Sequence, residues 1–178
     1  MSSSLSKNRR SMRYFEWSVL IVLFFVFLFV FYKHLDDIIE SSYDSTVKGL
    51  SGSLKSGVFL VKSQWMLSGS TNNVIDLDGY GDNDIDINVK GFPVGSKSDL
   101  NQIESGLQCI ELWQSLIRNS PGISLDPADN KDFIAKFENG KCYFTHQRSR
   151  ILKRVITYDP ENGEVETMSF AVETSIDI

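Results

Sequence analysis

Residues 17–32 read WSVLIVLFFVFLFVFY, and this run decides how the rest of the chain is arranged. It carries no charged side chain, and Ser18 is its one small polar residue. With the aromatic and apolar residues just upstream it reaches about 20 residues, the length of helix that crosses a bilayer core of about 30 Å. A helix on a soluble domain would show a polar face, and this run shows none. We therefore expect a transmembrane helix at residues 12–32.

The flanks of the run indicate its fate and its orientation. A cleaved signal peptide is the competing interpretation, but small residues would then follow, whereas residues 32–37 read YKHLDD. Four basic residues and Glu16 give the first 16 residues a net charge of +3. Because the net charge of the whole chain is −5, the remaining residues carry a net charge of −8. The positive-inside rule then predicts a cytoplasmic basic tail at residues 1–11 and a periplasmic C-terminal domain. The expected location is a single pass through a bacterial inner membrane.

Residues 33–67 carry apolar side chains at spacings of three and four, which predicts an amphipathic helix that continues the transmembrane helix. Gly49, Gly52 and Gly57 each cost about 1 kcal/mol relative to alanine in a helix, so packing must hold the helix together. We favour packing on the domain's own sheet, and the same stripe also offers an interaction surface for a partner. The stripe used for interaction comprises Leu35, Ile39, Val47, Leu50, Leu54, Val58 and Trp65, and Tyr43 and Val61 lie on the same face.

After residue 68 the apolar period changes from helical to two. Residues 75–77 and 85–89 predict two strands of a hairpin, which residues 91–95 end. Ser98 is a suitable N-cap for a second helix with Leu100, Ile103, Leu107, Ile110, Trp113 and Ile117 on its buried face. The helix stops at residues 119–122, and a polar connection follows to residue 132.

The last third of the chain is typical of β structure. Residues 133–138 and 141–145 flank Asn139-Gly140, a strong hairpin signal, and a second pair is predicted at residues 155–158 and 164–171. The expected fold class is α+β, with the long helix packed on a small antiparallel sheet in a periplasmic domain at residues 33–172. Residues 173–178 are expected to form a tail.

Cys109 and Cys142 are the two cysteines of the chain, and both are expected on the side of the membrane where disulfides persist. A bridge between them would close a loop of 33 residues and stabilise a small domain. Two buried free thiols are the alternative. Metal or catalytic use has no support from a CxxC motif or from nearby paired histidines.

An acidic segment at residues 76–86 is the one candidate ligand site. The metal-binding candidates are Asp78, Asp82, Asp84 and Asp86, and Ca²⁺ prefers oxygen ligands of this kind. No EF-hand pattern is present, and the carboxylates alternate with apolar residues. The solvated face of a hairpin is therefore favoured over a calcium site, and no cofactor is expected.

Neither of the two histidines lies in a catalytic motif. His34 lies beside the predicted membrane span, His146 lies beside Arg148, and we expect both on a surface or at an interface. No hydrolase or kinase motif occurs, so an enzyme is not expected. A pI near 5.0 leaves no electrostatic footprint for nucleic acid. The basic residues Arg148, Arg150, Lys153 and Arg154 favour a solvated loop and strand edge over a partner contact.

The order of these elements resembles type IV pilins and pseudopilins, and within that superfamily the MshF family of MSHA pilus biogenesis proteins. The resembling segments are residues 63–69, 77–79 and 87–95 and the helix that contains Cys109 and Trp113, of which Gly91-Phe92-Pro93 is the most specific. The glycine that precedes a prepilin processing site is missing before Tyr14-Phe15-Glu16.

The resemblance implies a non-enzymatic accessory component of pilus biogenesis, anchored in the inner membrane. Its partners would be other pilus assembly proteins or pilins. A membrane-tethered periplasmic binding module with a calcium-binding acidic hairpin is the alternative.

Overall fold

A single long helix, α1, runs from Ser3 to Leu67 in the computed structural model, so the expected continuation of the apolar helix to residue 67 is confirmed. Residues 3–97, 99, 101–149 and 152–171 are described, residues 3–14 and 36–37 by their backbone alone. The helix ends where Gly69 adopts a φ of 73° and the Ser68 N–H donates to the Gln64 carbonyl. Near its N-terminus α1 is long and apolar enough to cross a membrane, with a mean hydropathy of 2.4 in its most apolar window.

The chain divides into two compact units, Met1–Ser42 and Tyr43–Ile178, each described here by itself. In the first unit the apolar side chains of residues 19–32 are exposed, as a segment needs to be if lipid surrounds it. The second unit contains the remainder of α1 and every strand of the described chain. The predicted tail at residues 173–178 lies outside the described residues.

The apolar stripe of α1 is used by the chain's own domain. Val47, Leu54, Val58 and Val61 are buried in the core, and Leu50 and Trp65 pack against it. Packing of the helix on its own domain is thereby confirmed. The prediction of an interaction stripe needs correction. Val47, Leu54 and Val58 are buried by other residues of the same domain, so a partner cannot reach them. Ile39, in the first unit, is 45% exposed.

The three glycines of α1 have different environments. Gly49 and Gly52 face open space, whereas a Cβ on Gly57 would lie 2.8 Å from the backbone oxygen of Leu116 in the second helix, α2 (Gly106–Leu116). Only Gly57 therefore allows a close approach of the two helices.

Alanine substitutions should separate these roles. Gly49→Ala and Gly52→Ala are each expected to raise the free energy of unfolding by up to about 1 kcal/mol, because alanine favours the helix. Gly57→Ala is expected to lower it by about 1–3 kcal/mol through overpacking against α2. Thermal unfolding of the three variants checks this, and equal effects at all three positions would contradict it.

The smaller sheet differs from the predicted hairpin. Strand β1 (Ile85–Ile87) pairs antiparallel with β2 (Pro93–Ser96), the segment expected to end the hairpin. Val74 forms an isolated bridge with Ile87, but no strand forms at residues 75–77, because Asp76 has a φ of 56°. The predicted alternation also fails, since all three residues of β1 are buried.

Helix α2 starts later than predicted. Its N-cap is Ser105, which forms a capping box with Gln108, and the expected cap Ser98 lies outside the described residues, as does Leu100. Leu107 is 53% exposed, and Ile103 lies before the first residue of the helix. Neither residue therefore belongs to the buried face of α2, although the sequence predicted both there. The buried residues of α2 are Gln108, Cys109, Leu112, Trp113 and Leu116.

The larger sheet has five strands in the order β3-β4-β5-β6-β7. Their bounds are Ile123–Ser124, Phe133–Glu138, Lys141–His146, Leu152–Asp159 and Glu164–Ala171. Both predicted hairpins are confirmed, and Asn139 and Gly140 have the positive φ values that a two-residue turn requires. The predicted polar connection instead contains β3, which pairs parallel with β4, and a short 3-10 helix, η1 (Pro127–Asp129). The fold is α+β with a mixed sheet.

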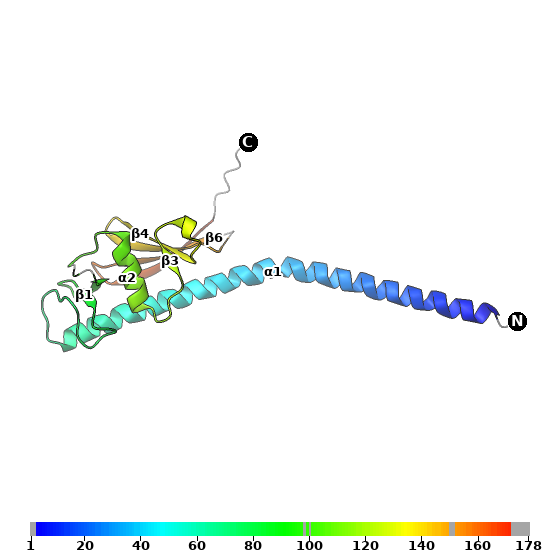
Figure 1. The fold of residues 1–178 in the computed structure, drawn as a ribbon, viewed down its shortest axis with the longest axis horizontal. Helices are drawn as coiled ribbons and strands as arrows, with labels where there is room; N and C mark the ends of the chain where they lie inside the picture. The colour runs from blue at the N-terminus through cyan, green and yellow to red at the C-terminus, as the bar shows by residue number, and fades with distance from the viewer. Residues whose placement is uncertain (1–2, 98, 100, 150–151, 172–178) are drawn as a thin grey trace, which may run out of the picture. The chain divides into compact units, whose positions relative to one another are not determined.

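The core is built between the helices and the sheet. Figure 1 shows α2 lying across the strands. The ring centroid of Trp113 on α2 lies 4.8 Å from the ring centroids of both Phe133 and Phe144. Tyr158 on β6 donates a hydrogen bond of 2.7 Å to the carbonyl of Pro93 on β2 and so joins the two sheets. Complete burial of the Tyr158 phenol raises its pKa well above the usual range, so it remains a donor.

The disulfide between Cys109 and Cys142 is present, with a Cα–Cα distance of 5.6 Å. Cys109 lies on α2, Cys142 lies on β5, and both are fully buried. The bridge therefore fixes the helix layer to the middle of the sheet.

Candidate functional site

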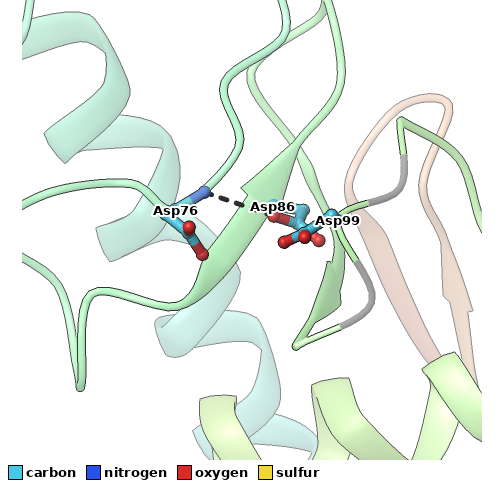
Figure 2. Close-up of side chains that lie close together, drawn as sticks. All are labelled: Asp76, Asp86 and Asp99. Atoms are coloured by element: carbon cyan, nitrogen blue, oxygen red, sulfur yellow. Dashed lines mark hydrogen bonds between the residues drawn. The ribbon is translucent and has the colours of Figure 1, made fainter.

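Three carboxylates gather beside the smaller sheet, and we call Asp76, Asp86 and Asp99 the acidic cluster. One carboxylate oxygen from each residue lies within 4.8 Å of one oxygen from each of the other two. Figure 2 shows Asp86 on β1, with Asp76 and Asp99 on the loops before and after the small sheet. The cluster thus joins segments separated by as many as 23 positions in the sequence, as 99 − 76 gives.

Local backbone geometry produces this gathering. Asp76 and Asp99 both adopt positive φ values, 56° and 49°, which aspartate tolerates better than most residues. The backbone N–H of Asp76 donates to Oδ1 of Asp86 at 3.2 Å. The side-chain amide of Asn73 donates to Oδ1 of Asn101, which ties together the loops that carry Asp76 and Asp99.

The electrostatics of the acidic cluster are unfavourable without compensation. Asp86 is 0% exposed, while Asp76 and Asp99 reach solvent. Two like charges about 5 Å apart repel each other by about 1 kcal/mol in water and more strongly near a protein interior. Oxygen donors of this kind are the ligands that Ca²⁺ prefers, and water would supply the remainder of its six to eight positions. Chemically, the cluster can hold a divalent cation at the surface of the small sheet.

The four predicted metal ligands do not meet at one point. Asp78 and Asp82 are exposed and lie outside the acidic cluster, and Asp84 accepts a hydrogen bond of 2.8 Å from the Ser96 hydroxyl. Only Asp86 belongs to the cluster. Its burial also contradicts the solvated face that sequence alternation favoured, because β1 is covered on both sides.

Asp76 and Asp99 are not among the four predicted ligands. Asp76 lies in the acidic segment but also in a predicted strand that does not form, and Asp99 follows Ser98, the expected cap of a helix that begins only at Gly106. The aspartate and asparagine content of both loops was the available signal. It could not reveal which loops meet.

The expectations for His146 and Arg154 need correction, whereas His34 is exposed as expected. His146 is 6% exposed. Its ring centroid lies 4.9 Å from that of Tyr43 and 5.1 Å from that of Phe133. Arg154 is 2% exposed and lies 3.6 Å from the Asp44 carboxylate of α1. Both therefore belong to the contact of α1 with the sheet.

The other expected basic residues stay outside that contact. Arg148 forms an ion pair of 2.9 Å with Asp132, and Lys153 is exposed. Arg150 lies outside the described residues.

Comparison with known proteins found no matching family model, no matching curated protein and no matching solved structure.

Proposed function

We propose that this chain is a non-enzymatic accessory or minor-pilin-like component of MSHA-type IV pilus biogenesis, anchored by α1 in a bacterial inner membrane. Its N-terminus lies in the cytoplasm and its C-terminal domain in the periplasm. Its partners are pilins or other assembly proteins, and MshF is the protein that its sequence motifs resemble.

One observation supports this proposal above the others. The same helix, Ser3–Leu67, contains a segment apolar and long enough to span a membrane and the apolar stripe of an α+β domain. A separate anchor joined by a linker would leave the domain complete without it. Here Val47, Leu54, Val58 and Val61 come from the helix itself, so the anchor is built into the fold.

The disulfide is a second supporting observation. Such bridges persist in oxidising compartments, of which the bacterial periplasm is one. A domain that lies on the same side of the membrane as the disulfide machinery agrees with the +3 charge of the N-terminal flank.

Cysteine labelling tests the topology. In intact bacteria, a membrane-impermeant maleimide is expected to label Gln114→Cys, which is exposed on α2, and to leave Ser4→Cys unlabelled until the cells are lysed. The native cysteines are bridged and serve as the background control. Labelling of both positions in intact cells, or of Ser4→Cys alone, would contradict the orientation.

Pilus assembly tests the role itself. Deletion of the gene in the source bacterium is expected to leave few or no surface filaments by electron microscopy, and the wild-type gene should restore them. A variant in which α1 residues 1–32 are replaced by a cleavable signal peptide should be secreted to the periplasm without restoring filaments. Normal filaments in the deletion strain would refute the proposal.

The second candidate function is that of a membrane-tethered module that binds a divalent cation. The observation that favours it is the acidic cluster, with one completely buried carboxylate and two others within 4.8 Å. This function rests on Asp76, Asp86 and Asp99, of which the sequence suggested only Asp86 as a ligand.

Calcium titration distinguishes the two. Cation binding predicts that Ca²⁺ at 100 times its dissociation constant raises the free energy of unfolding by about 2.7 kcal/mol, and the midpoint by several degrees. Asp99→Asn should abolish the rise, whereas Asp82→Asn, an exposed carboxylate outside the cluster, should retain it. An unchanged midpoint in the wild type would remove this candidate.

A further inference from the structure

Strand β7 leaves one edge of the larger sheet unpaired within the described chain. It has β6 as its single neighbour in the strand order, and all eight of its residues pair with β6 without a shift in register. The other edge is β3, which has only two residues. Natural edge strands are usually shortened, bulged or protected by lysine or proline. Residues 164–171, EVETMSFA, contain no lysine, proline or bulge, and their two charged residues, Glu164 and Glu166, lie in the N-terminal half of the strand.

An apolar row crosses the face of the sheet opposite the helices and ends at this edge. The strand registers place Ile134 beside Thr145, Thr145 beside Val155, and Val155 beside Met168. Phe170 lies two residues after Met168 on the same face of β7. Phe170 is 51% exposed and Met168 is 38% exposed. A groove of about 240 Å³ lies beside Val155, Met168 and Phe170, and the remainder of its lining comprises Lys136, Glu138, Tyr143, Thr145, Lys153 and Thr157.

The charges of β7 itself are both negative, whereas Lys153 on β6 lies beside Phe170 at the other end of the strand. Glu164 and Glu166 lie on the same face of β7 as Met168 and Phe170, toward its N-terminal end, because side chains alternate along a strand. Neither glutamate forms an ion pair within the described residues, although the Asn162 amide donates to Glu164 at 3.2 Å. A basic group on a neighbouring strand would complement them.

We propose that the edge of β7 accepts an added strand from a partner protein. The strand is an extended segment that runs antiparallel to β7. It carries apolar side chains at alternate positions beside Met168 and Phe170 and basic side chains beside Glu164 and Glu166. Main-chain hydrogen bonds provide affinity in such additions, and the alternate side chains provide specificity. The inference is independent of the proposed role in pilus biogenesis and of the acidic cluster.

The probe is a synthetic ten-residue peptide in which valine and phenylalanine alternate with threonine and two lysines lie near the C-terminal end. The peptide is titrated into the full chain in lipid nanodiscs and followed by fluorescence anisotropy. Bound peptide is expected to slow backbone amide exchange in β7 more than in β4, which lies on the far side of β5 and β6. Moving the lysines to the N-terminal end of the peptide should weaken binding, because they then face Met168 and Phe170.

Charge reversal provides the matched comparison. Glu166→Lys is expected to weaken binding about fivefold, and a peptide with glutamates in place of lysines should restore it. Glu138→Lys, an exposed carboxylate on β4 across the same groove, should change binding less than twofold by the same reasoning.

Three outcomes would overturn the proposal. The first is equal binding by both charge variants, and the second is no exchange protection in β7. The third is a dimer of the chain, detected by sedimentation, that already protects β7 without peptide, which would assign the edge to a second copy.

Discussion

Loss of the disulfide is expected to lower the free energy of unfolding of the domain by about 3–4 kcal/mol. The Cys109→Ala/Cys142→Ala variant opens a loop of 33 residues, and the loop-entropy relation assigns a stabilisation of this size to its closure. Because the bridge joins α2 to the middle of the sheet, we also expect faster amide exchange in α2. Thermal unfolding of the full chain in detergent micelles measures the effect, which should exceed about 10 °C in the midpoint.

The single variants serve as controls for the disulfide prediction. Each should be destabilised about as much as the double variant, because either one alone breaks the bridge. A double variant within about 1 kcal/mol of the wild type would show that packing of α2 alone fixes its position.

Truncation of Trp113 is expected to have a similarly large effect. Trp113→Ala removes a completely buried side chain that contacts both Phe133 and Phe144, so a loss of about 3–5 kcal/mol is expected. Near-ultraviolet circular dichroism should show the packing lost at a lower temperature than in the wild type.

Trp113→Phe isolates the contribution of the indole N–H, which donates to the Pro121 carbonyl at 3.2 Å. This variant keeps an aromatic ring in the core and should lose only about 1–2 kcal/mol. Equal losses in the two variants would mean that the hydrogen bond, and not the ring packing, dominates at this position.

Local signals in the sequence predicted the elements whose structure depends on nearby residues. Residues 33–67 carry a stripe at helical spacing, and Asn139-Gly140 specifies a tight turn, so α1 and the β4–β5 hairpin are where the sequence predicts them. The disulfide was predicted from the expected compartment and from the presence of two cysteines. Each of these inferences requires few contacts between distant segments.

The small sheet and the acidic cluster could not be predicted in the same way. Apolar alternation around Ile85 and Ile87 indicated a strand but not its partner, which is Pro93–Ser96. The ligands of the cluster depend on where the loops before β1 and after β2 meet, and on the left-handed backbone at Asp76 and Asp99. Such features are decided by tertiary packing, which the period of a single segment does not contain.

The order in which the chain is synthesised gives the packing of α1 on its own domain a further consequence. Asp44 of α1 meets Arg154 of β6, 110 positions later as 154 − 44 gives, and Tyr43 meets His146. At a ribosomal rate of about 5–20 residues per second, Asp44 emerges roughly 5–20 s before Arg154. During this interval Val47, Leu54 and Val58 lack part of the core that buries them in the folded domain. The contacts of Tyr43 and Asp44 with the sheet can therefore form only after β5 and β6 have been synthesised.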